Sequence, residues 1–229
     1  MNRVALVGEN STEYVDVLLD IWNRGDCAVL LDWRIPAQAK VSMMQEANIC
    51  ECYIEKDKLD ESLIAISHRI SFFTFEKKHN SVECLPASVY QKFKSNYSLS
   101  EALILYSSGT TGRSKGVILS HYAINTNADA IAKYMNLGCE DSVLIIKSLA
   151  HVSTLVGELL VGLKKRVRVF IAPSLTSPQF ALKCIEQHRI TTVCLNPALL
   201  NLYTKAQSIK KYCVQSLKAI YTRHCFKNC

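Results

Sequence analysis

The sequence contains no segment with the pattern of a membrane span or a secretion signal. No run reaches the ~18 uninterrupted apolar residues of a spanning helix. The nearest candidate, residues 149–163, is interrupted by His151 and Glu158. The N-terminal apolar stretch ends early, at Glu9 and Asn10, so it lacks the shape of a signal peptide. We therefore predict a cytoplasmic protein with no membrane span.

Clustered positive charge is also missing. The 229 residues include 27 lysines and arginines against 20 aspartates and glutamates, a formal net charge of +7. The basic runs at 164–166 and 210–211 are short, whereas a nucleic-acid interface needs a basic patch or stripe. We expect a solvated basic surface and no nucleic-acid partner, and the mild positive field suits polyanionic small molecules.

Zinc-finger spacing is absent, although the chain has ten cysteines. Cys50 and Cys52 are close in sequence, as are Cys225 and Cys229, but neither pair has the required spacing with a second matching pair. Because no secretion signal places the chain in an oxidising compartment, we predict reduced, mostly buried thiols and no metal site.

Strand and helix patterns alternate along most of the chain. Residues 3–7 form an apolar run typical of a strand, residues 10–12 offer helix caps, and Gly25 ends the helix before a second apolar run at 27–31. Strand, helix and strand within about thirty residues predict a parallel βαβ unit. Further strands are predicted at 52–54, 72–75, 102–106, 117–119, 141–146, 168–172, 191–195 and 216–222, and further helices at 36–47, 58–67, 121–135, 152–163 and 177–188.

Changes in pattern divide the chain into three portions. Residues 1–100 form a first α/β portion that ends in a weakly patterned lead-in, and residues 101–222 form a second α/β portion. Residues 223–229 are an atypical tail that fits no element. Because the sequence changes abruptly after Thr222, we hypothesise a frame change or truncation near that residue.

A loop rich in hydroxyl groups and glycine separates the predicted strands 102–106 and 117–119. Hydroxyls supply hydrogen-bond donors, glycines let the backbone approach a ligand closely, and Lys115 adds a mobile positive charge, a combination that suits phosphate. The loop is not the nucleotide P-loop, which needs Gly-x-x-x-x-Gly-Lys followed by Ser or Thr and a helix. On composition alone, an ordinary hairpin loop is the expected structure. The candidate phosphate-binding residues are Ser107, Ser108, Gly109, Thr110, Thr111, Gly112 and Lys115.

The complete string from Tyr106 to His121 is far more specific than its composition. Tyr-Ser-Ser-Gly-Thr-Thr-Gly-x-x-Lys-Gly-Val-x-x-Ser-His resembles the phosphate-binding signature of the adenylate-forming superfamily, which includes acyl-CoA synthetases and peptide-synthetase adenylation domains. Ser114 stands where the family usually has proline. Other motifs match in the family's order, so the resemblance covers nearly all of residues 3–222 but only the front of a typical member. It implies layered, mixed, largely parallel sheets with helices on both faces, like the front part of the family's large N-terminal domain.

His151 is the other candidate site residue. It ends the string Ser-Leu-Ala-His after the predicted strand 141–146, where the family has a short Pro-Leu-x-His-like string. The resemblance implies that His151 lines the acyl pocket near the reaction centre. A lone histidine beside an apolar helix is more often a structural core residue, so both interpretations stay open.

The resemblance also implies a reaction. The family activates a small carboxylic acid by its attack on the α-phosphate of ATP, releases pyrophosphate, and passes the acyl group to a thiol. ATP with Mg²⁺ is the expected cofactor, and both coenzyme A and the phosphopantetheine of an acyl-carrier protein are open as acceptors. The family's adenine, ribose and magnesium ligands and its catalytic lysine correspond to sequence beyond residue 229, so we expect a catalytically incomplete chain.

Three functions stay open on the sequence. The first is a truncated adenylate-forming ligase. The second is a non-catalytic remnant or binding module that needs a complementing C-terminal polypeptide, and an unpaired sheet edge near Tyr221 would be its sign. The third is an unrelated α/β binding domain with a coincidental loop. The sequence does not identify the carboxylic acid.

Overall fold

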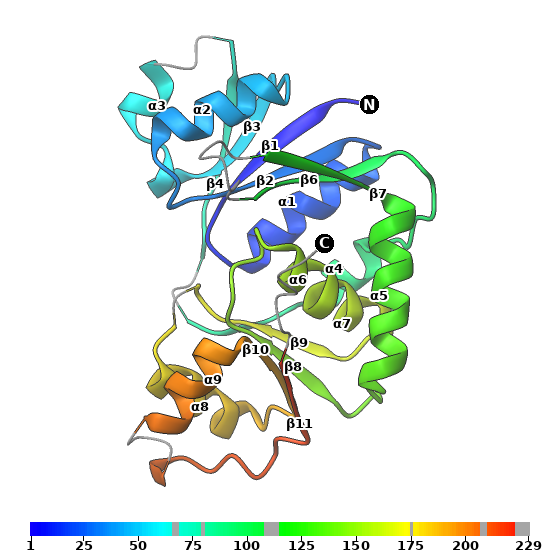
Figure 1. Cartoon of the computed structure of the whole chain (residues 1–229), viewed down its shortest axis with the longest axis vertical. Helices are drawn as coiled ribbons and strands as arrows, with labels where there is room; N and C mark the ends of the chain where they lie inside the picture. The colour runs from blue at the N-terminus through cyan, green and yellow to red at the C-terminus, as the bar shows by residue number, and fades with distance from the viewer. Residues whose placement is uncertain (66–68, 79–80, 108–114, 175, 207–209, 223–229) are drawn as a thin grey trace.

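The protein consists of two β-sheets with helices between them and on their outer faces (Figure 1). The structure is a computed structural model that describes residues 1–65, 69–78, 81–107, 115–174, 176–206 and 210–222. The predicted layered, largely parallel α/β fold is confirmed.

The first sheet is built on the predicted βαβ unit. Its first elements are β1 (Arg3–Gly8), α1 (Thr12–Asn23), β2 (Cys27–Asp32), α2 (Ala37–Glu46), β3 (Glu51–Glu55), the 3₁₀-helix η1 (Lys56–Lys58), α3 (Glu61–Ala65) and β4 (Ser71–Phe75). Strands β1 and β2 pair in parallel, and the Ser11 hydroxyl caps α1 by accepting a hydrogen bond from the Tyr14 N–H at 3.0 Å. Gly25, at φ +80°, makes the turn into β2.

A hairpin completes the first sheet. Strands β6 (Glu101–Ser107) and β7 (Lys115–Ser120) pair antiparallel, and the helix α5 (His121–Met135) follows directly. The Ser120 hydroxyl accepts a hydrogen bond from the Ala123 N–H at 3.1 Å, which confirms the predicted cap. The strand order is β4-β3-β1-β2-β6-β7, so β4, which contains the phenylalanines 72, 73 and 75, is the edge strand that the sequence predicts.

The second sheet is parallel except at one edge. Its elements are β5 (Glu83–Cys84), α4 (Ala87–Lys92), β8 (Ser142–Ile145), β9 (Arg168–Ile171), α8 (Pro178–His188), β10 (Thr192–Leu195), α9 (Pro197–Lys205) and β11 (Ala219–Thr222). The order is β11-β10-β8-β9-β5, with β5 antiparallel to β9. Among the described residues, strand β11, which contains Tyr221, is the edge strand of this order.

A continuous helical run connects β8 to β9. It consists of α6 (Val152–Thr154), a six-residue π-helix η2 (Leu155–Leu160) and α7 (Val161–Lys165). The sequence predicts a single apolar helix here, and the π-helical middle is a difference. Apolar residues continue through all three segments, so their pattern does not reveal where the hydrogen bonding changes from i+4 to i+5.

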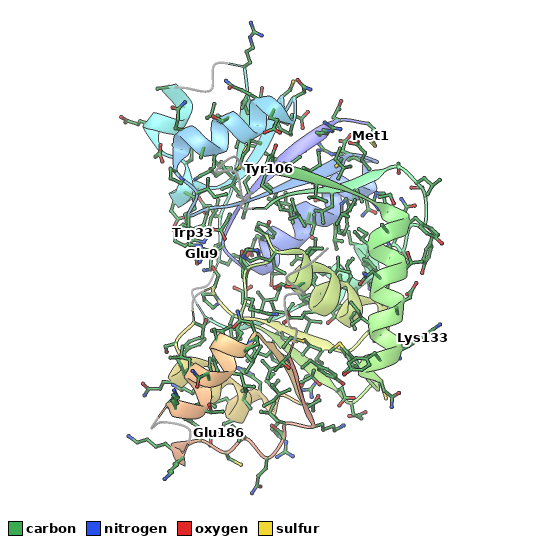
Figure 2. All side chains as sticks on the ribbon, viewed as in Figure 1. Met1, Glu9, Trp33, Tyr106, Lys133 and Glu186 are labelled. Carbon is green, nitrogen blue, oxygen red and sulfur yellow. The ribbon has the colours of Figure 1, made fainter. Side chains whose placement is uncertain are left out.

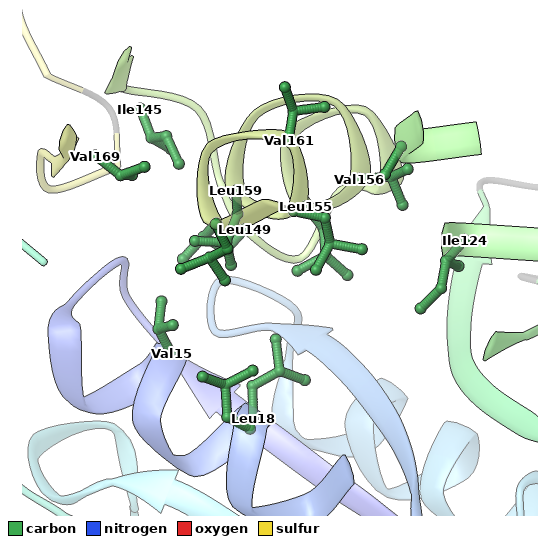
Figure 3. Packing of buried hydrophobic residues seen from close by; sticks show 14 of the residues in the cluster. Val15, Leu18, Ile124, Ile145, Leu149, Leu155, Val156, Leu159, Val161 and Val169 are labelled. Carbon is green, nitrogen blue, oxygen red and sulfur yellow. The ribbon is translucent and has the colours of Figure 1, made fainter. Parts of the chain in front are cut away.

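The largest hydrophobic cluster lies between the two sheets. It joins residues of β1, β2 and β6 to residues of β8 and β9 through α1, α5 and η2. Figure 3 shows Leu149, Leu155 and Leu159 above Val15 and Leu18 of α1. Two further clusters cover the outer faces, one beneath α2 and α3 and one beneath α8 and α9. The result is alternating helix and sheet layers, which buries both faces of each parallel sheet.

The exposure of the cysteines differs from the prediction. Cys27, Cys52, Cys184 and Cys194 are buried and Cys50, Cys84, Cys139 and Cys213 are exposed, so the expectation that most thiols are buried is wrong for this part of the chain. Each sheet draws strands from both sides of residue 100, and the division at that residue stays a prediction. Residues 223–229 lie outside the described residues. Within the described ranges, no helix is long and apolar enough to cross a membrane.

Candidate active site

A cavity of about 600 Å³ lies at the carboxyl ends of the parallel strands of the second sheet. We call it the strand-end cavity. Its lining includes Ser148 after β8, Thr176 after β9 and Asn196 after β10, together with Arg34 from the first sheet. Ligands of open α/β sheets characteristically bind outside the carboxyl ends of the strands. This cavity is therefore the candidate binding site.

His151 lines the strand-end cavity. It precedes α6 in an extended conformation, and its carbonyl accepts hydrogen bonds from the N–H groups of Thr154 and Leu155, both at 3.0 Å. Its own N–H donates to the Ser148 carbonyl at 3.2 Å. The backbone turn is thus fixed while the side chain is exposed. His151 is therefore not a buried core residue, and its contact with a ligand stays a proposal.

An ion pair from the first sheet lies beside His151. Arg34 Nε donates to Asp32 Oδ1 at 2.7 Å, and Arg34 Nη2 pairs with Asp32 Oδ2. Burial opposes ionisation of Asp32, but the hydrogen bonds from Arg34 outweigh it and the charge of His151 adds to them, so the pKa of Asp32 is lowered. Asp32 ends β2, so the cavity is bordered by the carboxyl ends of strands from both sheets.

Asn10 connects the first sheet to the loop that carries His151. It is buried, and its Nδ2 donates to the carbonyls of Lys147 (2.8 Å) and Ala172 (3.2 Å). Its Oδ1 accepts from the Leu149 N–H at 2.9 Å. One side chain thereby satisfies backbone groups after both β8 and β9. Asn10 is a positioning residue for the wall of the strand-end cavity.

The predicted phosphate loop is described only at its two ends. Ser107 ends β6 and pairs in register with Lys115, which begins β7 and is exposed. Because β6 is parallel to β2, Lys115 lies at the end of the first sheet where β2 finishes at Asp32. Lys115 is not among the described residues that line the strand-end cavity. The other candidates, Ser108, Gly109, Thr110, Thr111 and Gly112, lie outside the described residues.

Tyr106, the first residue of the signature string, has a structural contact. Its hydroxyl donates to the Met43 carbonyl in α2 at 2.7 Å, and burial raises its pKa to about 12 (Figure 2). The neutral phenol therefore fastens the hairpin to α2. This contact fixes β6 immediately before the hydroxyl-rich loop.

A buried ion pair forms another part of the cavity wall. Lys147, directly after β8, places Nζ 2.7 Å from Oε1 of Glu158 in η2. The Glu158 side chain is 1% exposed and the Lys147 side chain 15%. Lys147 also lines a second cavity of about 260 Å³ between α5, η2 and β10, which we call the apolar cavity.

Asn10, Arg34 and Lys147 belong to the candidate site and were not predicted from the sequence. The position of Lys147 in the sequence could have predicted it, because a charged residue at the carboxyl end of a buried strand commonly faces a ligand site. Glu158 could also have predicted a buried ion pair, because a lone carboxylate in an apolar helix needs a partner. Within the described ranges, no group of three or more His, Cys, Asp or Glu side chains is placed to hold a metal ion.

Comparison with known proteins identifies the family of the chain. A family model described as AMP-binding enzyme matches residues 1–224. A 2-succinylbenzoate–CoA ligase from Bacillus cytotoxicus is 29% identical over 201 residues, which cover 86% of this chain and 38% of the relative. A mitochondrial malonate–CoA ligase from Xenopus laevis is 28% identical over 192 residues, 81% of this chain and 32% of the relative. The chain thus spans well under half the length of these relatives.

Solved structures share the fold. ATP-bound MatB from Rhodopseudomonas palustris superposes with a TM-score of 0.80 at 20% identity, over 96% of this chain and 44% of that one. The O-succinylbenzoate coenzyme A synthetase MenE from Bacillus subtilis, in complex with AMP, superposes with a TM-score of 0.77 at 18% identity, over 97% of this chain and 55% of that one.

Proposed function

Because the chain belongs to the AMP-binding enzyme family, we propose that it serves the ATP-dependent activation of a small carboxylic acid, through an acyl adenylate that is passed on to a thiol. The observation that carries the proposal is the family match across residues 1–224, which includes the whole hydroxyl-rich loop. The relatives it resembles are named as CoA ligases, which is consistent with this chemistry.

The hydroxyl-rich loop is the proposed phosphate site. In the activation step the substrate carboxylate forms a bond to the α-phosphorus of ATP, and the bond to the pyrophosphate leaving group breaks. Donors and cations placed around the phosphates stabilise the charge that shifts onto that leaving group. Mg²⁺, bound with ATP, would supply part of the charge. The residues proposed to hold the β- and γ-phosphates are Ser107, Ser108, Gly109, Thr110, Thr111, Gly112 and Lys115.

Lys115 fits this role chemically. It is exposed at the end of the hairpin and has no ion-pair partner among the residues that the structure describes. A lysine ammonium is a strong phosphate ligand as a point charge. The strand-end cavity would admit the carboxylic acid, with His151 at the wall nearest the reacting carboxylate. Coenzyme A or an acyl-carrier protein would supply the thiol, in the cytoplasm.

A binding module that needs a complementing C-terminal polypeptide is the second candidate. Strand β11 is at the edge of the second sheet, and Ile220 on it is 47% exposed. An exposed edge strand can pair with another chain. This candidate shares the phosphate site and differs in whether the 229-residue chain acts alone.

Exchange of labelled pyrophosphate into ATP distinguishes the candidates. The chain is assayed with a panel of carboxylic acids, beside Lys115→Ala and the control Lys133→Ala, whose side chain projects from the outer side of α5 (Figure 2). For a chain that acts alone, exchange depends on the acid, falls about tenfold or more in Lys115→Ala and is unchanged in Lys133→Ala. Exchange that appears only with an added C-terminal polypeptide of a family member supports the binding module. No exchange under either condition contradicts both.

A further inference from the structure

The strand-end cavity and the apolar cavity adjoin each other. Lys147, Ser153 and Leu195 line both cavities, so these residues form their common wall. A ligand that reaches from His151 past this wall would place its body in the apolar cavity. On the proposed function, that ligand is the carboxylic acid.

The apolar cavity has room for a compact ring. Ile131 and Met135 of α5, Gly157 of η2, Cys194 of β10 and Tyr221 of β11 contribute to its mostly apolar lining. Its volume is about 260 Å³. Apolar protein cavities of about 150 Å³ bind benzene. A phenyl-sized group with a short linker therefore matches this space, whereas a long chain exceeds it.

The one charged group at the apolar cavity is Lys147, within the described part of the chain. Glu158 lies behind it, almost completely buried, and its Oε1 is 2.7 Å from Lys147 Nζ. The ion pair fixes the ammonium at the common wall. An ammonium has three N–H donors, and Glu158 Oε1 can accept only one of them in a linear hydrogen bond. Within the described residues Lys147 Nζ has no acceptor other than Glu158, which leaves its remaining N–H donors to a ligand oxygen.

Resting on the proposed function, we propose that Lys147, held by Glu158, selects a carboxylic acid that has a compact apolar body and a second carboxylate. The first carboxylate would lie in the strand-end cavity near His151, and the second would accept a charge-assisted hydrogen bond from Lys147. An acid with no second anionic group would leave this charged wall facing apolar atoms. Lys147 is thus a specificity-determining residue.

Two matched acids test this selection. Phenylsuccinate and 3-phenylpropanoate share a phenyl ring and a carboxylate, and differ by the second carboxylate. Their binding to the full chain is measured by calorimetry without ATP. We expect phenylsuccinate to bind about tenfold or more tightly than 3-phenylpropanoate. Equal affinity, or no measurable binding of phenylsuccinate, overturns the proposal.

Three variants assign the effect to Lys147. The double variant Lys147→Met with Glu158→Leu removes both charges together, which a folded core tolerates better than the loss of one partner, and should abolish the preference. Glu158→Gln should increase it, because the ammonium loses its internal counter-charge. Lys164→Met removes a lysine that pairs with Asp129 away from both cavities and should leave the preference unchanged. Thermal melts verify that each variant is folded.

The outcomes separate this inference from the proposed function. A preference that the double variant retains overturns the inference, even if the chain exchanges pyrophosphate. A Lys147-dependent preference in a chain without exchange supports the inference as a binding property and counts against catalysis by the chain alone.

Discussion

Asn10 shows how one side chain can connect two sheets. Its amide lies after β1 and bonds to backbone groups after β8 and β9, all of them buried or nearly so. An amide suits this position because it both donates and accepts. The contact also fixes the backbone of Lys147 and Leu149, and therefore the turn that places His151 in the strand-end cavity.

We predict that Asn10→Ala lowers the free energy of unfolding by about 1–3 kcal/mol, because it leaves buried backbone groups without partners. Chemical denaturation measures the change. The matched control is Asn23→Ala, which removes a single exposed hydrogen bond to the Lys92 carbonyl and should change stability by less than about 0.5 kcal/mol. Similar losses in the two variants would contradict the role assigned to Asn10.

His121 makes stability depend on pH. Its side chain is buried at the start of α5, with its ring 5.9 Å from that of Trp22 in an edge-to-face arrangement. Burial lowers its pKa, so the native state keeps it neutral at pH values where the unfolded chain binds a proton. The contribution is complete above the unfolded value of ~6.5 and is lost as the pH falls from there toward the lowered native pKa.

We predict that His121→Phe, which retains a ring beside Trp22, flattens the dependence of unfolding free energy on pH. Below pH ~6.5, the slope of unfolding free energy against pH should be smaller in the variant than in the wild type. Urea unfolding at a series of pH values between neutrality and pH ~5 measures it. Parallel curves for the two proteins would show that His121 is protonated equally in both states.

Sequence reasoning succeeded at residues whose role is local. Ser11 and Ser120 cap helices that begin immediately after them, and the pattern that reveals such caps lies within a few residues. Asn10 and Lys147 act across 137 residues of sequence, and no local pattern records such a contact. Most of the phosphate loop lies outside the described residues, so its assignment stays a proposal.

Most strands and helices were predicted because their patterns are strong. The apolar runs of β1, β2 and β8 are buried on both faces, and α1 and α5 show helical spacing between clear caps. The short strand β5 was missed, because two residues carry no periodicity and its pairing with β9 is a tertiary contact. The π-helix η2 was missed because apolar residues continue without a break from α6 through η2 to α7.

The helical run through η2 and α7 packs closely on β9. A Cβ added at Gly162 would lie 2.3 Å from Val169 Cγ2, and Val169 is fully buried and branched at Cβ. The valine has little freedom to move aside. The absence of a side chain at Gly162 therefore sets how near α7 approaches the second sheet.

We predict that Gly162→Ala destabilises the protein by about 1–2 kcal/mol, because overpacking outweighs the gain in helix propensity. The control Gly138→Ala would bring its Cβ only to 3.8 Å from an Asp141 oxygen and should change the midpoint of unfolding little. Thermal or urea unfolding of both variants measures this. A stabilised Gly162→Ala would show that Val169 can yield and that the close packing is not required.

At the scale of the whole molecule, one hydrophobic cluster joins both sheets. The helical layer of α1, α5 and η2 is its centre, and the strand-end cavity lies where loops of the second sheet meet the end of β2. The sequence predicted layers of largely parallel sheets through the family resemblance. It did not predict which strands belong to which sheet, because that assignment depends on connections between segments far apart in the chain.

The central claim is that the hairpin formed by β6 and β7 binds the phosphates of ATP through its connecting loop, which ends at Lys115. Calorimetric titration of the full chain with Mg–ATP tests it most directly, beside Lys115→Ala and Lys133→Ala. We predict saturable binding to the wild type and to Lys133→Ala, weakened about tenfold or more in Lys115→Ala. A folded wild type that does not bind ATP, or a Lys115→Ala variant that binds it equally well, would contradict the account.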